Sequence, residues 1–473
     1  MHLQQSMKRV TLFLSLVIIL FSTTMNCFLI IRLSSTTIVN PKSSSSYEIS
    51  PKENLPIKSK YLAEISQINW SNTDVISVII EDNIAYLSCY SEGIKVVNVT
   101  DIFHPVLISN YSDMGNTQSI AKKDNYLFLA NGLAGLTVLD ISNIYSIQKV
   151  AELFDGGTAL DIKIWEDYCF IADGTDGIEI IDISDPLSPK EVSQLKIPHS
   201  NSQAISINYF RGLIEIALGS WGMIYVDIND IGNPSILNYY TESNVIDIYS
   251  ESAERGYYSW AASGPLGVAL IVWSGSYYTT PYAYGRYSDG GSANGLAFYN
   301  NGVFVADGFD GIEYIQHEIN QLEEKSFFND GGWAMDVVYE SASNRLFVAD
   351  GSDGLEIIGD DLDNDYLADL KEEEMIGTDS NVNDTDGDGY LDGIEVYHGT
   401  DPLNAEDFPD LVTTTPSITI PDISTPPDYT SRTNTTTSFK SPGFGFGITL
   451  SGISLLSLAF ISHIFINNRK RKK

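Results

Sequence analysis

The stretch "DYCFIADGTDGIEIIDISDP" at residues 167–186 holds an apolar run, a tight turn that ends in Gly and an aliphatic residue, and a second apolar run. Two near-duplicates follow, "GVFVADGFDGIEYIQHE" (302–318) and "RLFVADGSDGLEIIGDD" (345–361). β-branched and aromatic residues flank each turn, and Asp-Gly pairs suit a tight hairpin, so both runs are predicted strands. The glycine at the end of the turn recurs every 42–45 residues, at Gly93, Gly135, Gly177, Gly222, Gly267, Gly311 and Gly354.

Each repeat has room for four short strands, and residues 61–359 show no helical period. A period of about 40–45 residues with several strands per unit predicts an all-β fold, a seven-bladed β-propeller over residues 60–359. The last repeat lacks its own fourth strand, whereas Lys60–Asn72 resembles the fourth strand of the first repeat, His104–Asn116. We therefore expect the N-terminal strand to complete the last blade and close the ring, which protects the strand edges.

The repeats carry a family signature. The runs "GIKVVNVTD" (93–101), "GLTVLDISN" (135–143) and "GIEIIDISDP" (177–186) resemble the LVIVD-repeat family of propellers, and later copies drift from the pattern. The resemblance implies the propeller fold. It implies little about activity, because propellers carry many unrelated functions.

The clearest chemical motif is "DTDGDGYLDGIE" at residues 384–395. It matches a twelve-residue calcium loop, in which oxygen ligands come from positions 1, 3, 5, 7, 9 and 12 and Gly389 makes the turn at position 6. Those positions are Asp384, Asp386, Asp388, Tyr390 (through its carbonyl), Asp392 and Glu395. The sequence predicts a Ca²⁺ site here; the alternative is a solvated acidic run.

A weaker copy, "DLDNDYLADLKE" (361–372), lies 23 residues earlier, with Tyr366 in place of the turn glycine. This substitution puts its geometry in doubt. The copy keeps acids at Asp361, Asp363, Asp365, Asp369 and Glu372. The pair resembles thrombospondin type 3 calcium repeats over residues 360–410, which implies calcium-filled loops stacked into a compact rod. The segment holds 18 acids against one lysine, so without a cation we expect it to be disordered.

Both ends of the chain predict an extracytoplasmic propeller at the cell membrane. Lys8-Arg9 precedes the uncharged run Val10–Ile31, so residues 1–32 are a signal peptide or an N-terminal membrane anchor. Residues 443–473 contain a second apolar run, Gly445–Ile466, before the basic end Arg469–Lys473. The positive-inside rule places both basic groups in the cytoplasm and the propeller at the cell surface.

The C-terminal anchor has a second feature. Pro442-Gly443-Phe444 before an apolar run and a basic end resembles the archaeal PGF-type sorting signal, which implies that the tail is removed and replaced by a lipid. The alternative is a plain transmembrane helix. The Ser/Pro-rich linker 33–59 and the Thr/Ser/Pro-rich stalk 411–442 cannot bury a core.

The amino-acid composition limits the classes of molecule that this chain is expected to bind. The net charge of −35, from 62 acidic and 27 basic residues, argues against a nucleic-acid partner, because like charges repel. Three cysteines provide no disulfide scaffold, and Cys89 and Cys169 are expected to be core residues.

One repeat position stands out as polar. It lies sixteen residues before most of the repeat glycines, in the predicted middle of the innermost strand, so its side chains should ring the central channel. The position holds Ser77, Ser119, Asp161, Ser206, Asp247, Gly295 and Asp336. Asp161, Asp247 and Asp336 are candidate ligands for a cation or polar molecule, and the alternative is a set of small polar side chains facing water.

Four loops that enter the innermost strands are expected to meet at one channel mouth: "FDGGT" (154–158), "IPHSN" (197–201), "SDGGS" (288–292) and "NDGGW" (329–333). His199 and Trp333 are candidate binding residues there, unless the glycines only make turns. The chain has no nucleophile elbow, Cys–His pairing or phosphate loop. The sequence therefore predicts a non-enzymatic adhesion or interaction protein with an extracellular protein or glycan partner. An extracellular hydrolase or lyase acting at the mouth, and a structural envelope component, are the alternatives.

Overall fold

The computed structural model describes residues 61–409 apart from 113–114, 155, 198–205, 211, 242–243, 254–255, 274–278 and 319–320. All described residues belong to one of two compact units of the chain, Met1–Asp410. Within them, no helix is both long and apolar enough to cross a membrane. Several predicted features lie outside the described residues, namely the apolar runs Val10–Ile31 and Gly445–Ile466, the linker 33–59, the stalk 411–442 and Pro442-Gly443-Phe444.

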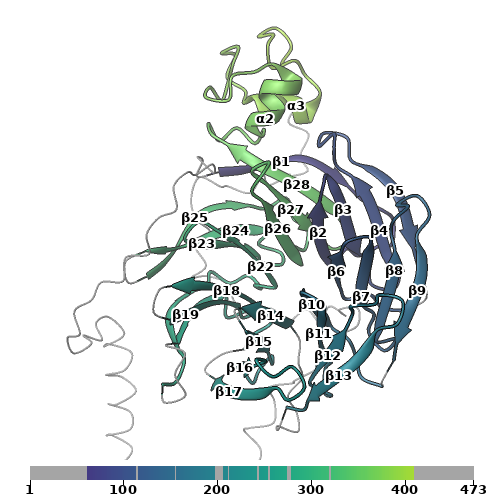
Figure 1. Ribbon diagram of the computed structural model, residues 1–473. Helices are drawn as coiled ribbons and strands as arrows, with labels where there is room; N and C mark the ends of the chain where they lie inside the picture. Colours follow the sequence, from purple (N-terminus) through teal and green to yellow (C-terminus); the bar gives the residue numbers. More distant parts are fainter. Residues whose placement is uncertain are drawn as a thin grey trace, which may run out of the picture. The chain divides into compact units, whose positions relative to one another are not determined.

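The described chain is mostly β-strand, as predicted, and forms five four-stranded sheets and one eight-stranded sheet. The eight-stranded sheet consists of two four-stranded halves joined by a single pair, Tyr61 with Phe327. We number the four-stranded groups 1 to 7 in chain order, and Figure 1 shows them following one another. This arrangement is that of a β-propeller.

The strands have these bounds. Sheet 1 contains β2 (Ser77–Glu81), β3 (Ile84–Ser88), β4 (Ile94–Asn98) and β5 (Val106–Tyr111), and sheet 2 contains β6 (Ser119–Lys123), β7 (Tyr126–Ala130), β8 (Leu136–Asp140) and β9 (Gln148–Leu153). Sheet 3 contains β10 (Asp161–Trp165), β11 (Tyr168–Ala172), β12 (Ile178–Asp182) and β13 (Lys190–Leu195). Sheet 4 contains β14 (Ser206–Phe210), β15 (Leu213–Ala217), β16 (Met223–Asp227) and β17 (Ser235–Tyr240). Sheet 5 contains β18 (Asp247–Ala253), β19 (Gly256–Ala262), β20 (Val268–Trp273) and β21 (Tyr282–Tyr287). Sheet 6 contains β22 (Gly295–Tyr299), β23 (Gly302–Ala306), β24 (Ile312–Glu318) and β25 (Gln321–Phe328), and sheet 7 contains β26 (Asp336–Glu340), β27 (Arg345–Ala349), β28 (Leu355–Asp361) and β1 (Tyr61–Ile68).

The N-terminal strand β1 completes the last sheet, as the sequence predicted. It pairs antiparallel with β28, from Tyr61 opposite Asp361 to Ile68 opposite Leu355. The repeat glycine Gly354 has φ 93°, and a Cβ there would lie 2.3 Å from the carbonyl oxygen of Ile68. In sheet 3 the equivalent glycine has φ 95° and the same 2.3 Å approach to the last residue of its fourth strand, β13. The strand β1 therefore takes the place of a fourth strand, and only glycine fits the turn beside it.

Packing follows the order of the sheets. The innermost strands β2, β6, β10, β14, β18, β22 and β26 each contact the next, and β26 contacts β2. In the described part of the chain, seven buried hydrophobic clusters each draw on two consecutive sheets. Each large aliphatic or aromatic side chain buried in them contributes about 1.5–3 kcal/mol. Cys89 and Cys169 are buried and free, as predicted.

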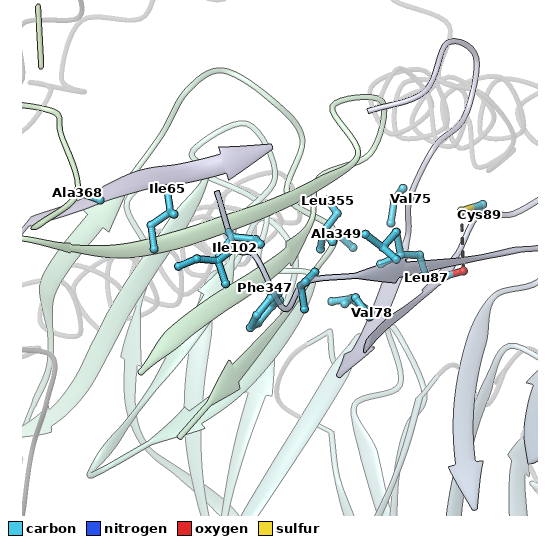
Figure 2. Packing of buried hydrophobic residues seen from close by; sticks show 14 of the residues in the cluster. Ile65, Val75, Val78, Leu87, Cys89, Ile102, Phe347, Ala349, Leu355 and Ala368 are labelled. Carbon is cyan, nitrogen blue, oxygen red and sulfur yellow. Dashed lines mark hydrogen bonds between the residues drawn. The ribbon is translucent and has the colours of Figure 1, made fainter. Parts of the chain in front are cut away.

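The cluster in Figure 2 joins the last sheet to the first. Phe347 and Leu355 come from sheet 7, Val78 and Leu87 from sheet 1, and Ile65 from β1. The innermost strands and this cluster thus close the ring of sheets on itself.

The acidic segment after β28 contains helical turns that the sequence did not predict. They are α2 (Asp369–Lys371), the π-helical turn η1 (Glu372–Ile376) and α3 (Asp392–His398). Ala368 is fully buried in the Figure 2 cluster, and Leu370 packs against it. Strand β28 runs two residues past the predicted boundary at 359, and its last residue, Asp361, is the first residue of the weaker acidic loop. The segment therefore begins inside the last sheet.

Candidate functional site

The loop 384–395 folds around its own carboxylates. Asp384 accepts hydrogen bonds from the backbone N–H groups of Gly387 (2.8 Å) and Gly389 (2.9 Å). Asp388 accepts one from Tyr390 N (2.9 Å). These bonds bend the chain so that one oxygen each of Asp384, Asp386 and Asp388 lies within 4.8 Å of the others.

The oxygens left over define the centre of this loop. Asp386 Oδ2, Asp388 Oδ2 and both carboxylate oxygens of Glu395 are buried and accept no hydrogen bond from any described residue. A buried carboxylate oxygen without a partner is costly, because it has lost its water. Glu395 lies in the first turn of α3, which carries its carboxylate back toward the aspartates. Four unpartnered oxygens from positions 3, 5 and 12 fit the ligand shell of Ca²⁺.

The weaker copy, residues 361–372, has the same hydrogen-bond pattern. Asp361 accepts from Asn364 N (2.7 Å) and Tyr366 N (3.2 Å), as Asp384 does from positions 4 and 6 of its loop. Both oxygens of Asp363 and one of Glu372 are buried without a partner among the described residues. The two loops are therefore copies in structure as well as in sequence.

Tyr366 adopts the turn that glycine makes in the second loop. Its φ is 75°, and that of Gly389 is 102°. A side chain in this left-handed region costs about 1–3 kcal/mol. The substitution that placed the geometry in doubt therefore leaves the fold of the loop intact and adds strain.

The two loops also share a group of acids. One oxygen each of Asp365, Glu372 and Asp392 lies within 4.8 Å of the others, and all three residues are buried. Asp365 accepts a hydrogen bond from Gly393 N (3.2 Å), and a Cβ at Gly393 would lie 2.3 Å from the Asp365 carbonyl oxygen. Asp392, predicted as a ligand of the second loop, therefore also faces the first loop. Spacing within one loop could not show this contact.

Burial and the crowding of acids raise the pKa values of two glutamates. Burial and then repulsion from Asp388 and Asp386 raise the pKa of Glu395 to about 7. Burial and then Asp365 and Asp363 raise the pKa of Glu372 to about 8. Charged carboxylates in these positions need a compensating charge, and a divalent cation would supply it.

The seven residues at the polar repeat position also lie on neighbouring strands, but here the carboxylates accept hydrogen bonds from the protein. Each is the first residue of an innermost strand, where the sequence predicted the middle. Asp161 accepts hydrogen bonds from Ser119 Oγ (2.7 Å) of the preceding sheet and from Ser206 Oγ (2.9 Å) and Ile207 N (2.9 Å) of the next. The carboxylate therefore fastens three neighbouring sheets to one another.

Asp247 and Asp336 also accept hydrogen bonds from strands of neighbouring sheets. Asp247 accepts from Leu296 N (3.0 Å) and lies 2.8 Å from Ser206 Oγ, whose single hydrogen it shares with Asp161. Asp336 accepts from Val78 N (3.2 Å) and from the Ser77 hydroxyl. All three carboxylates thus have protein donors, which favours a structural role over a ligand role.

Lys163 supplies the positive charge that these aspartates need. It lies two residues after Asp161 on β10, so both side chains point to the same face. Attraction by Asp161 raises the pKa of Lys163, and Asp247 and Asp336 raise it further. Burial raises the pKa of Asp247 to about 6, although Lys163 lowers it. Sequence reasoning missed Lys163, although the period of two along a strand was available as a signal.

The three predicted mouth loops that the structure describes in large part, 154–158, 288–292 and 329–333, lie at one end of the sheets. Backbone bridges such as Gly132–Ala159 and Gly308–Ala334 join the turn between the second and third strands of one sheet to the loop that enters the next sheet. We call the surface made by these turns and loops the turn face. It carries exposed apolar side chains at Leu133, Phe154, Trp221, Leu266, Phe309 and Trp333. Trp333 packs edge-on against Phe309, with ring centroids 4.1 Å apart, while His199 lies outside the described residues.

Two families match parts of the chain. The LVIVD repeat matches residues 114–148 and 156–196, and the bacterial TSP3 repeat matches residues 384–405. The TSP3 family is calcium-binding, so the match falls on the loop with the unpartnered oxygens. The chain is therefore a β-propeller repeat protein with a calcium-type repeat.

No curated protein matches the chain. Among solved structures, the computationally designed Ika8 protein is similar at 11% identity and a TM-score of 0.46, covering 63% of this chain and 99% of that one. The WD40 β-propeller domain of Doa1 is similar at 10% identity and a TM-score of 0.49, covering 63% and 96%. At these scores neither similarity carries weight, and the fold rests on the strand pairing described above.

Proposed function

We propose that this chain is a non-catalytic binding protein of the cell surface, which presents a closed seven-bladed propeller on a calcium-stabilised segment. The observation that carries the proposal is the set of unpartnered buried oxygens on Asp386, Asp388 and Glu395. Calcium loops of this kind suit an extracellular medium, where the ion is abundant and a site of modest affinity is filled.

Closure into seven blades is supported by three observations. The innermost strands contact one another in a cycle, the hydrophobic clusters link consecutive sheets, and β1 supplies the fourth strand of sheet 7. A closed ring of sheets leaves only short, protected sheet edges, which suits a protein that works outside the cell.

Binding at the turn face is supported by its exposed aromatic side chains. Aromatic residues combine a large contact area with little conformational entropy, so they dominate many recognition surfaces. The Phe309 side chain is 65% exposed on the turn face, and other residues make up the hydrophobic core of its sheet. A protein or glycan of the cell surface is the partner class that fits this position.

Location follows from the sequence of both ends. Basic residues flank both apolar runs, so the propeller lies at the extracytoplasmic face of the membrane, and the PGF-type segment implies processing of the C-terminal anchor. Protease added to intact cells should remove the propeller, and the mature protein should lack Arg469–Lys473 by mass spectrometry. Protection of the propeller in intact cells would overturn the location, and recovery of the basic tail would leave a plain membrane anchor.

The binding role is tested with an array of surface glycans and envelope proteins probed with the full chain. Replacement of both Phe309 and Trp333 by alanine should abolish the signal. The matched control is Tyr145→Ala, which removes an aromatic side chain that is 76% exposed on the turn between β8 and β9, away from the turn face. Equal loss in the control, or no loss in the double variant, would contradict binding at the turn face.

A further inference from the structure

Sheets 6 and 7 each contain a second kind of acid cluster, at the turn face and outside the two loops of residues 361–395. In sheet 6, one oxygen each of Asp289, Asp307 and Glu313 lies within 4.8 Å of the others. In sheet 7, the same holds for Asp330, Asp350 and Asp353. Asp289 and Asp330 belong to the Asp-Gly-Gly loops that enter the innermost strands.

The clusters are built around one deeply buried aspartate each. Asp307 is 3% exposed and Asp350 is 2% exposed. Asp307 Oδ1 and Asp350 Oδ2 accept no hydrogen bond from any residue that the structure describes. By comparison, the equally buried Glu215 accepts hydrogen bonds from Ser250 and Ser259. The fold can therefore supply donors to a buried acid, and it does not supply them to these oxygens.

The surrounding backbone is shaped to hold these carboxylates. A Cβ at Gly291 would lie 1.9 Å from Asp307 Oδ2, and a Cβ at Gly332 would lie 1.7 Å from Asp350 Oδ2. The second glycine of each Asp-Gly-Gly loop is thus needed for the carboxylate to lie over the backbone. The close approach of the carboxylate explains the second glycine of each loop, which the turn alone does not require.

Sheet 2 shows that the fold does not need acids at these positions. There Asn131 replaces the buried aspartate and Thr137 replaces the glutamate two residues after the repeat glycine. Asn131 donates to Thr137 Oγ1 (3.2 Å) and accepts from Thr117 Oγ1 (3.2 Å), and it also lies over a glycine, Gly115. A neutral, hydrogen-bonded pair therefore fills the same space, so the acids in sheets 6 and 7 call for another explanation.

We propose that the clusters Asp289–Asp307–Glu313 and Asp330–Asp350–Asp353 each bind a calcium ion at the turn face. Three carboxylates offer up to six oxygens, which suits a hard cation that takes six to eight oxygen ligands, with water completing the shell. The ion replaces the missing hydrogen-bond donors of the buried aspartate. It also fixes the Asp-Gly-Gly loop next to the exposed pair Phe309 and Trp333, so calcium would order the binding surface itself.

The pKa values of the two buried aspartates agree with a missing positive charge beside them. Burial and then repulsion by Asp289 raise the pKa of Asp307 to about 8. Burial and then Asp330 raise the pKa of Asp350 to about 7. The competing explanation is that these acids are protonated and share protons, with no ion present.

The test counts ions on the full chain. Calcium per chain is measured by equilibrium dialysis at saturation for the wild type and for the double variant Asp307→Asn with Glu313→Thr, which installs the neutral pair of sheet 2. We expect one ion fewer per chain. The control Asp124→Asn removes an exposed acid from another loop and should leave the count unchanged. An unchanged count in the folded double variant would show a proton-sharing cluster only and overturn the proposal for sheet 6.

Terbium tests sheet 7 separately, because the backbone N–H of Trp333 donates to Asp350, so a tryptophan residue adjoins that cluster. Excitation of tryptophan should give terbium emission, which Trp333→Phe should dim at an unchanged ion count. Asp353→Asn, at the partly exposed edge of the cluster, should lower both emission and count without disturbing the core. Emission that is indifferent to both variants would overturn the site in sheet 7.

Discussion

The aspartates of the innermost strands and the acids of the loop 384–395 carry the same carboxylate group in opposite surroundings. Asp161, Asp247 and Asp336 receive hydrogen bonds from neighbouring strands and face Lys163. Asp386, Asp388 and Glu395 hold oxygens to which no described group donates. The number of acids is therefore a poor guide to a cation site. What separates the two regions is whether the protein itself provides partners for each oxygen.

The largest effect should come from removing the ions. Chelation of calcium should expose residues 360–409 to protease, because their carboxylates then repel one another, while the propeller keeps its β-sheet circular dichroism. Limited proteolysis followed by mass spectrometry reads the cleavage sites. Cleavage that begins in the sheets, or no new cleavage at all, would reverse the assignment of calcium dependence to this segment.

Glu395→Ala isolates the second loop. It removes two unpartnered oxygens, so calcium affinity there should fall by more than about tenfold, since even indirect ligand support is worth that much. Calorimetric titration of the full chain measures it. The control is Glu406→Ala, which removes an exposed acid after the loop. Equal affinity and stoichiometry in wild type and Glu395→Ala would reduce residues 384–395 to an acidic linker.

Asp161→Ala probes the opposite region. It deprives Ser119 and Ile207 of their acceptor, while Ser206 keeps Asp247, so the free energy of unfolding of the propeller should fall by about 2–4 kcal/mol. Calcium binding should not change. Denaturant unfolding with a parallel calcium titration separates the two outcomes, and a lost calcium ion in this variant would mean that the channel is itself a metal site.

The variant Lys163→Met tests the charges of the innermost strands through the pH dependence of stability. The pKa of Asp247 is about 6 in the folded protein, above its ordinary value, so the folded state binds the proton more tightly and stability falls as pH rises toward 6. Lys163 holds this pKa down, so in Lys163→Met the fall should continue to higher pH. Melting temperatures across a pH series provide the measurement, and superimposable profiles would remove Lys163 from the electrostatics of the ring.

The smallest effect concerns Tyr366. Replacement by glycine relieves about 1–3 kcal/mol of left-handed strain, offset by about 0.5–1 kcal/mol for the freer unfolded chain. A net gain of about 1 kcal/mol, within the range of these two terms, should raise the affinity of the first loop for calcium by roughly fivefold. Titration in a background that combines Glu395→Ala with the turn-face variants Asp307→Asn, Glu313→Thr and Asp353→Asn isolates that loop. A drop in affinity would indicate that the Tyr366 side chain contributes to the folded loop.

The sequence predicted the repeating features well and the contacts between repeats poorly. Repeat spacing identified the strands, the closing strand β1 and the polar position that holds Asp161, because one pattern recurs in every unit. It misplaced that position within the strand, since hydrophobic periodicity does not define where a strand begins. Contacts between distant units were invisible, as with Asp392 near Asp365 and Glu372.

The buried acids of sheets 6 and 7 had a signal that went unused. An acid recurs at the fourth residue before and the second residue after the repeat glycine in sheets 3, 6 and 7, where sheet 2 has Asn131 and Thr137. A charged residue at a buried position of a strand needs a hydrogen-bond or ionic partner. Spacing alone could not say that the Asp-Gly-Gly loop lies over it, because this depends on how β21 and β25 lead into the next sheet.

The pairing of Tyr61 with Asp361 has a mechanical consequence. The chain enters and leaves the ring at the same rung of one strand pair, and Asp361 is also the first carboxylate of the acidic loop 361–372. Tension between the two ends would open this rung first and then peel β1 from β28 one pair at a time. On the proposed calcium binding, an ion in the loop at Asp361 would stabilise that rung, and the calcium level would then affect the pulling force at which the ring of sheets comes apart.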